Sequence, residues 1–312
     1  MNKKQLASRL LQIIVVLIGI SFLTFMLTYI SPGDPVRTML SATGVIPSEE
    51  LVQSIRDEMG LNDPFLTQYF RWLGNCLHGD FGDSYSFSDP VVSLLAARLW
   101  PTLKLTIFSM VLMLIISVPL GILSAVYKNS WIDYLVRGFT FLGISLPNFW
   151  VGLLLMLVFC VQVQWFNVVS SAGSFQDMIL PSATLAIAMS SKYTRQVRTA
   201  MLEELNQDYV VGARARGVPE WKIIWLNVFP NSLLPLITML GLSVGSLLGG
   251  TSVVEVIFSY PGLGNLAVSA ITSCDYNLIQ GYVLWIALIY MVINLVVDIS
   301  YNFVDPRMRL KR

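Results

Sequence analysis

Long uncharged apolar runs are the feature that most limits what this chain can fold into. The first covers residues 10–33 and follows the basic residues Lys3, Lys4 and Arg9. It is longer than the ~20 residues that a helix needs to cross a bilayer. No small-x-small cleavage site closes it, so we expect a retained transmembrane helix and not a cleaved signal peptide.

Five further apolar runs are long enough to span a membrane, and they lie at 102–127, 138–162, 179–199, 233–258 and 281–303. The run at 179–199 is the weakest because Lys192 and Arg195 enter its end. Pro147 should kink the run at 138–162. Only 12% of the residues are charged, against roughly 25% in a soluble protein. We therefore predict an all-α integral membrane protein with six transmembrane helices.

The distribution of lysine and arginine predicts the orientation. Six spans place both termini on one side, and most of the 20 basic residues then fall in segments of that same side. The short segments 163–178 and 259–280 on the other side contain none. Because cytoplasmic loops carry the excess of basic residues, we expect both termini inside.

Residues 31–100 form the one sizeable segment that we expect outside the membrane, and they hold nine acidic and four basic residues. Ser48 precedes a helical pattern that Gly60 should end. A second helix is expected at 66–77. These helices should lie against the outer membrane face, since the segment is too small for an independent domain.

The polar stretch 207–231 interrupts the apolar pattern on the cytoplasmic side. Gly217-Val218-Pro219 should separate two helices, the second of which carries Trp221 and Trp225 on one face. Two interpretations stay open at this point. The helices either lie in the lipid interface, with basic residues toward phosphate, or dock into a groove of a partner protein.

This stretch resembles the EAA loop of bacterial ABC importer permeases, whose pattern is Glu-Ala-Ala, three residues, Gly, nine residues, Ile-x-Leu-Pro. The corresponding positions here are Val211-Gly212-Ala213, Gly217 and Asn227-Val228-Phe229-Pro230. The spacing is intact, and Ala213, Gly217 and Pro230 match. The glutamate, the first alanine, the isoleucine and the leucine are replaced, which leaves the detailed contacts of the loop open.

Further stretches are similar to the dipeptide, oligopeptide and nickel permease family. They are Gly60–Val91, Phe141–Trp150, Gly249–Gly281 and the DPRMR sequence of Asp305–Arg309. This resemblance implies the permease subunit of a type I ABC importer in the bacterial cytoplasmic membrane. Such a subunit moves solute by alternating access and works with a second related permease, two cytoplasmic ATPases and an extracytoplasmic solute-binding protein.

The resemblance also implies that the chain is not an enzyme. It binds no cofactor, and ATP and Mg are used by the partner subunits. The sequence agrees, since no Gly-Lys dipeptide is present and a phosphate-binding P-loop is therefore excluded. The implied organisation is a tail and first helix at 1–30, an extracytoplasmic segment at 31–100, a permease core at 101–303 and a tail at 304–312. The core contains the coupling loop 199–231.

The resemblance assigns contact with the ATPase to residues of the coupling loop, namely Asp208, Tyr209, Ala213, Arg214, Arg216, Gly217, Val218, Pro219, Trp221 and Pro230. In the fifth span, Gly241, Gly245 and Gly249 recur every four residues, a spacing that lets membrane helices approach closely. They serve either packing within the chain or contact with the second permease along the path. Glu255, near the outer end of that span, either reaches water, caps a loop or touches the path.

Other interpretations and the solute stay open. A secondary transporter driven by an ion gradient would need intramembrane acids, for which Glu255 and Asp298 are the candidates. A receptor or scaffold leaves the resemblance unexplained. The family carries peptides and nickel or metal chelates, and His78 is the only histidine. The three cysteines have no metal-ligand spacing, and a disulfide between Cys76 and Cys274 stays open.

Overall fold

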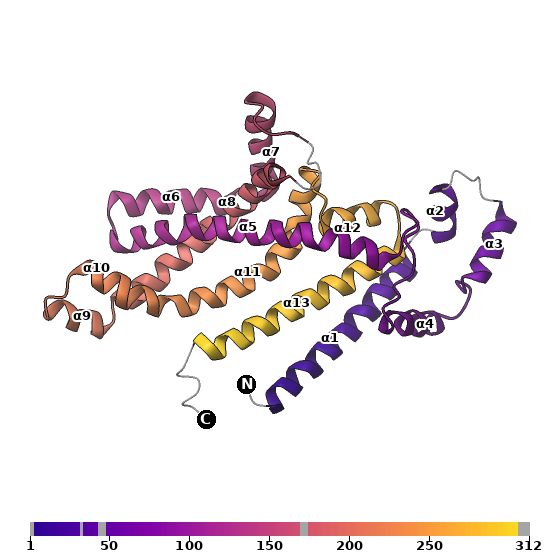
Figure 1. The fold of residues 1–312 in the computed structure, drawn as a ribbon, viewed down its shortest axis with the longest axis horizontal. Helices are drawn as coiled ribbons and strands as arrows, with labels where there is room; N and C mark the ends of the chain where they lie inside the picture. The colour runs from indigo at the N-terminus through magenta and orange to yellow at the C-terminus, as the bar shows by residue number, and fades with distance from the viewer. Residues whose placement is uncertain (1–2, 32–33, 43–47, 169–173, 305–312) are drawn as a thin grey trace. The chain divides into compact units, whose positions relative to one another are not determined.

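The computed structural model describes residues 3–31, 34–42, 48–168 and 174–304, and these residues are almost entirely helical (Figure 1). Their only β-type pairing is an isolated bridge between Asp83 and Pro90. The predicted all-α class is confirmed. The chain forms two compact units, and each is described by itself. Unit 1 consists of 1–102 and 261–295, and unit 2 consists of 103–260 and 296–312.

Unit 1 contains seven helices or parts of helices within the described ranges. They are α1 Lys3–Ile30, α2 Pro35–Ala42, α3 Glu49–Glu58, α4 Phe65–Leu77, the start of α5 Val91–Val126, α12 Leu263–Thr272 and most of α13 Tyr276–Val304. Helix α4 packs on α1 through aromatic rings. Phe22 and Phe25 contact Phe65 and Tyr69 at centroid distances of 5.4–5.7 Å. The Tyr69 hydroxyl also lies 2.9 Å from Ser21 Oγ.

The predicted helices of the segment 31–100 are confirmed. Ser48 Oγ accepts a hydrogen bond from the amide of Leu51 and so caps α3. Gly60, with φ of +65°, ends that helix. The amide of Leu61 donates back to the carbonyl of Arg56 at 2.9 Å, which is the return bond of a Schellman motif. Helix α4 begins within one residue of the predicted start.

A buried carboxylate ties the loop before α5 to the turn before α13. Asp275 is fully buried and accepts hydrogen bonds from Ser84 Oγ at 2.5 Å and from the amide of Ser86 at 3.1 Å. It also caps α13 by accepting from the amide of Leu278. These bonds provide the buried carboxylate of Asp275 with hydrogen-bond donors. They therefore hold residues 84–86 against the turn before α13.

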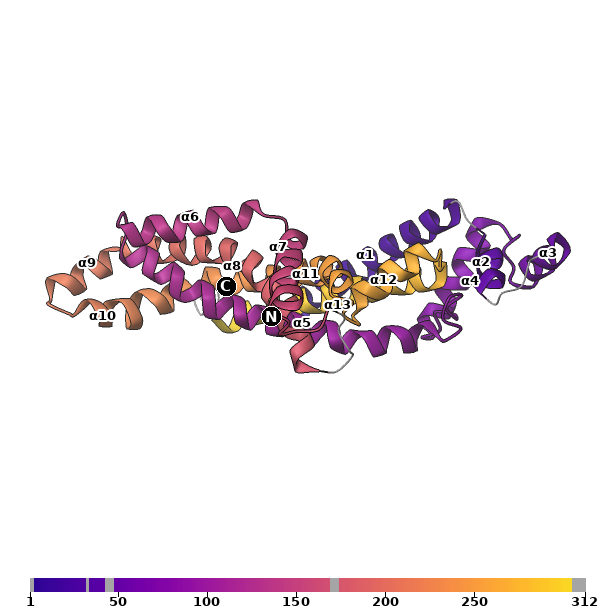
Figure 2. The ribbon, with the colours of Figure 1, turned by 90° about the horizontal axis from the view of Figure 1, so that it is seen from above.

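Unit 2 contains the remaining helices, which Figures 1 and 2 show from two sides. They are the rest of α5, α6 Trp131–Ser145, α7 Asn148–Met156, the π-helix η1 Leu157–Gln162, α8 Phe175–Leu205, α9 Asp208–Ala215, α10 Glu220–Lys222, the π-helix η2 Ile223–Val228, α11 Phe229–Ile257 and the end of α13. Helix α8 is the centre of this unit, since α6, α7 and α11 all pack on it. A Cβ at Gly121 of α5 would lie 2.5 Å from the Val197 side chain of α8, so glycine permits this close approach.

The third predicted span is not one straight helix. Helices α6 and α7 with η1 meet at an angle of 98°. Leu146 is extended and Pro147 begins the next helix, because a residue before proline avoids the helical conformation. The kink predicted at Pro147 is therefore confirmed, and it is a full break.

Among the described residues, three helical segments are long and apolar enough to cross a membrane, at Ala7–Ile30, Val91–Val126 and Tyr276–Val296. Two bent pairs of helices, Trp131–Ser145 with Asn148–Gln162 and Glu220–Leu233 with Pro235–Gly245, raise the number to at most five if each pair is one span, although the start of the second pair belongs to the polar stretch 207–231. The predicted span 179–199 lies within α8, a helix of 31 residues that is less apolar than these segments and is not among them. The predicted number of six transmembrane helices is therefore approximate, since the described residues contain three to five such spans. Apolar side chains of α1, such as Leu11, Val15 and Leu27, are exposed, as expected for a surface that faces lipid.

All three cysteines are free, so the disulfide left open between Cys76 and Cys274 does not form. The surroundings of the Asp298 side chain and the whole segment 305–309 lie outside the described residues.

Candidate functional site

The stretch 207–231 folds as two short helical arms, and we call it the hairpin. Helix α8 ends at Leu205, α9 forms the first arm, and α10 with η2 forms the second arm, which continues into α11 (Figures 1 and 2). The predicted order of helix, sharp turn and helix is confirmed. The second arm is not regular, however, because it changes to π-helix at Ile223.

The turn between the arms is a Schellman motif built on Gly217. The amide of Gly217 donates to the carbonyl of Arg214 at 2.9 Å, and the amide of Val218 donates to the carbonyl of Ala213 at 3.2 Å. Gly217 has φ of +74°, a left-handed conformation that glycine adopts without a steric penalty. Val218 packs against the buried cluster that contains Ala213, which is the hydrophobic contact typical of this motif. Pro219 caps the second arm.

An ion pair bridges the two arms on either side of this turn. Arg214 Nε lies 2.6 Å from Glu220 Oε1, and Arg214 Nη2 lies 3.3 Å from Glu220 Oε2. The guanidinium lowers the pKa of Glu220 below its ordinary value, so the pair is charged at neutral pH. Both side chains are exposed, and an exposed pair contributes at most ~1 kcal/mol. Its bidentate geometry nevertheless links the two arms directly across the turn.

One face of the hairpin is buried against α8 and α11. Val210 and Ala213 of the first arm and Ile223 and Val228 of the second arm are 0–3% exposed. They share a single apolar cluster with Val197, Ala200 and Met201 of α8 and Leu236 of α11. The hairpin is therefore packed onto two long helices and is not a free loop.

The opposite face is exposed and unusually apolar. Its exposed large side chains are Tyr209, Val211, Trp221, Trp225 and Leu226. Lys222 Nζ lies 5.5 Å from the centre of the Trp221 ring, within the range of a cation–π contact. The Tyr209 hydroxyl donates to Glu204 at 2.7 Å, and burial raises the pKa of Tyr209, so the phenol stays protonated. An exposed apolar patch with charged neighbours is typical of a surface that contacts a partner protein or the membrane.

The structure places the predicted coupling residues on both faces. Ala213 is buried and Val218 is half-buried, so these two support the hairpin from within. The remaining eight are exposed, namely Asp208, Tyr209, Arg214, Arg216, Gly217, Pro219, Trp221 and Pro230. Asp208 lies in the first turn of α9, where the helix dipole favours an acid.

The predicted residues of the fifth span lie on α11, away from the hairpin sequence. Gly241 is buried, Gly245 is half-buried and Gly249 is exposed. A Cβ at Gly249 would have no atom within 4 Å, so this glycine is not needed for close packing within the chain. Glu255 is fully buried, so of the alternatives left open for it, contact with water is excluded in this structure.

Sequence reasoning missed a buried ion pair near the hairpin. Asp133 of α6 is fully buried and accepts two bonds of 2.8 Å from Arg198 of α8. It also accepts hydrogen bonds from Ser124 Oγ at 2.6 Å and from the amide of Asn129 at 3.0 Å. The pair joins the α5–α6 turn to the helix that carries the hairpin. Its partners lie 65 positions apart in the sequence, so no local pattern could have revealed the pair.

Comparison with known proteins gives the family. Residues 117–310 match the family described as "Binding-protein-dependent transport system inner membrane component", and residues 3–106 match its N-terminal part. The chain is 36% identical to the probable D,D-dipeptide transport system permease protein DdpB of Escherichia coli K12, over 95% of this chain and 94% of that protein. It is 39% identical to the glutathione transport system permease protein GsiC of Escherichia coli K12, over 97% of this chain and 98% of that protein.

A solved structure of the MetNI methionine ABC transporter in an inward-facing conformation has the same fold, with a TM-score of 0.57. The match covers 70% of this chain and 100% of that chain at 19% sequence identity. The two relatives match this chain along almost its whole length, and the family match covers more than half of it. Both findings are consistent with the helical fold. The chain therefore belongs to the binding-protein-dependent transport system inner membrane component family and is a permease subunit of an ABC importer.

Proposed function

We propose that this permease imports short peptides or closely related small solutes and that the hairpin couples transport to ATP hydrolysis by partner subunits. The observation that supports the proposal is the Gly217 turn, which joins two arms that are buried on one face and apolar on the other. Such an element can bind a groove of a partner and pass its displacement to α8 and α11.

The proposed assembly contains a second related permease, two cytoplasmic ATPases that use ATP and Mg, and an extracytoplasmic solute-binding protein. Both termini lie in the cytoplasm and residues 31–100 lie outside, as the distribution of basic residues indicates. Closure of the ATPases moves the hairpin, and the path then alternates between outward and inward access. Gly249, which has open space around it, is available for contact with the second permease.

The names of the relatives support one solute class for the proposal. The two relatives described above are named for a dipeptide and for glutathione, which supports a peptide as solute. Metal or metal-chelate import, which the wider family includes, has no comparable support. Within the described residues, no group of three or more His, Cys, Asp or Glu side chains could hold a metal ion.

A matched pair of tryptophans tests the coupling role. Trp221 in the hairpin and Trp100 in unit 1 are both 59% exposed. A photoreactive amino acid is placed at either position, and the assembly is purified through a tag on this chain and irradiated. We expect a covalent adduct with a nucleotide-binding subunit from Trp221 and none from Trp100. Adducts with lipid alone at Trp221 would contradict the proposed coupling role and favour an interfacial hairpin.

A further inference from the structure

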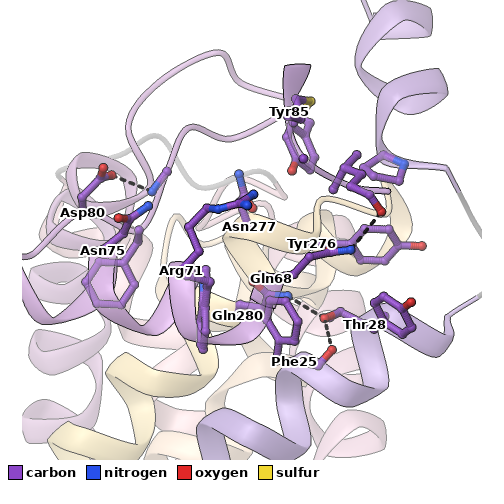
Figure 3. Close-up of a pocket in the computed structure, with 18 of the residues that line it drawn as sticks. Phe25, Thr28, Gln68, Arg71, Asn75, Asp80, Tyr85, Tyr276, Asn277 and Gln280 are labelled. Atoms are coloured by element: carbon purple, nitrogen blue, oxygen red, sulfur yellow. Dashed lines mark hydrogen bonds between the residues drawn. The ribbon is translucent and has the colours of Figure 1, made fainter. Parts of the chain in front are cut away.

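Each unit contains a large cavity among its described residues, and the two cavities differ in how their charges are compensated. The cavity of unit 1 lies between α1, α4, the loop before α5 and the start of α13 (Figure 3). The arginines that line it already have acidic partners. Arg71 pairs with Asp63, and Arg56 pairs with Asp34 at 3.0 Å.

The cavity of unit 2 lies between α6 and α8 and has a volume of about 800 Å³. These two helices pack side by side, as Figures 1 and 2 show. Arg137 and Phe141 line the cavity from α6, and Arg195, Arg198 and Thr199 line it from α8. A cavity of this volume can hold a small organic group.

The lining of this cavity carries positive charge that the described residues do not compensate. It contains three arginines and no aspartate or glutamate. Arg198 is compensated by the buried Asp133. Arg137 and Arg195 are exposed, and neither forms an ion pair with a described residue. Each guanidinium has five N–H donors and no acceptor, so the cavity favours an anion with several oxygen atoms.

The surface beside the cavity changes along α6 from aromatic to apolar. Trp131 and Tyr134 in the first turn of α6 are exposed, and Arg137 Cζ lies 5.7 Å from the centre of the Tyr134 ring. Phe141 and Leu142, further along the helix, are exposed as well. Tryptophan and tyrosine are enriched at the membrane interface, and apolar side chains face the hydrocarbon core. The cavity therefore lies where a membrane helix passes from the headgroup region into the hydrocarbon core.

We propose that the cavity between α6 and α8 binds the headgroup of an anionic phospholipid such as phosphatidylglycerol. Arg137 and Arg195 donate hydrogen bonds to the phosphate oxygens, and the acyl chains lie along Phe141 and Leu142. Basic pockets between transmembrane helices on the cytoplasmic side bind such headgroups in other membrane proteins. The assignment of the site to the cytoplasmic leaflet rests on the proposed function.

The test measures binding of phosphatidylglycerol to the complete, delipidated assembly in detergent by native mass spectrometry. A basic residue near the membrane surface contributes about 5-fold to the affinity for an anionic lipid, so Arg137→Gln and Arg195→Gln should each weaken binding by about this factor. Lys128→Gln is the matched control, since Lys128 is an exposed residue of the α5–α6 turn that does not line the cavity. Because exposed charges at a distance are screened by salt, this variant should change the affinity by less than about 2-fold. Equal losses in all three variants would show a general attraction to the basic surface and would overturn the proposed site.

Two further ligands separate a bound lipid from other anions. Phosphatidylcholine has the same phosphate and acyl chains but adds a cation, so it should bind more weakly than phosphatidylglycerol. Inorganic phosphate at millimolar concentration should not displace phosphatidylglycerol, because it has no chains to lie along α6. If phosphate displaces the lipid completely, the cavity is a site for soluble anions and the lipid proposal is wrong.

A photoreactive amino acid at Phe141 tests what covers this face in the assembly. Irradiation in nanodiscs that contain phosphatidylglycerol should give lipid adducts, whereas adducts with the second permease alone would overturn the proposal. ATP-dependent uptake is measured in the same preparations. If uptake persists while phosphatidylglycerol does not bind specifically, the lipid site fails and the proposed function stands. If the lipid binds specifically while uptake is absent, the proposed function fails and the lipid site stands.

Discussion

The conformation of Gly217 leads to a graded prediction for coupling. A Cβ at this position would meet no atom within 4 Å, so a substitution is penalised only by the backbone φ of +74°. An L-residue in the left-handed region costs ~1–2 kcal/mol, whereas asparagine tolerates that region better. A cost of this size reduces the population of the closed turn about 5- to 30-fold. Coupling should therefore fall in the order glycine, asparagine, alanine, valine.

The assay is ATP hydrolysis stimulated by the loaded binding protein, together with uptake into proteoliposomes of the same assembly. Gly212→Ala serves as the matched control. Gly212 is helical, and a Cβ there also meets no atom within 4 Å. Alanine stabilises a helix by about 1 kcal/mol relative to glycine, so this variant should couple normally. Normal uptake with Gly217→Val, or equal losses at both glycines, would refute the argument.

Charge reversal separates a bridge between the arms from direct contact with a partner. Glu220→Arg places two cations beside each other across the turn and should weaken coupling 2- to 5-fold, as expected for an exposed pair worth up to ~1 kcal/mol. Adding Arg214→Glu restores the pair in reverse and should restore coupling. If the double variant couples no better than the single one, each side chain contacts the partner directly.

Three further predictions concern the two units. Gly121→Ala should lower the free energy of unfolding of the assembly by ~1–3 kcal/mol, because the added methyl group overpacks the contact between α5 and α8. The control Gly138→Ala, with open space around the added methyl group, should not lower it. Equal melting temperatures of the two variants would contradict the close approach of α5 and α8. Asp133→Asn should destabilise the folded protein by ~3 kcal/mol because Arg198 loses its buried charged partner. In a double-mutant cycle, this loss of stability should be smaller when Arg198→Gln is already present. Burial raises the pKa of Tyr85 to about 12. In the folded protein the Tyr85 phenol keeps its proton above pH ~10, whereas in the unfolded chain it loses that proton. The free energy of unfolding should therefore fall between pH 10 and 12. Chemical denaturation across this pH range should show a smaller fall in Tyr85→Phe than in the unaltered protein.

Features that depend on neighbouring residues were predictable from the sequence. Ser48 and Gly60 mark the ends of α3 because capping needs an accepting side chain at one end and a left-handed residue at the other. The same chemistry at Gly217 predicted the turn of the hairpin. The break at Pro147 followed from proline alone, although its angle of 98° did not.

Features that join distant residues were not predictable. Asp133 and Arg198 lie 65 positions apart, and the cavity of unit 1 combines α1 with α13. An acid in an apolar helix indicates that a partner exists but does not identify it. The burial of Glu255 was left undecided for the same reason, since a position near a helix end allows either exposure or burial until the packing around it is known.

If the hairpin couples transport as proposed, its buried face explains why the turn, and not the packing, should limit coupling. Val210, Ile223 and Val228 are fully buried, and each such side chain contributes about 1.5–3 kcal/mol. Their contacts with α8 and α11 together exceed the ~1–2 kcal/mol at stake in the Gly217 turn. A displacement of the intact hairpin therefore moves both long helices with it. When the turn is damaged, each arm stays attached to the core but the angle between the arms is lost, and the displacement is no longer transmitted.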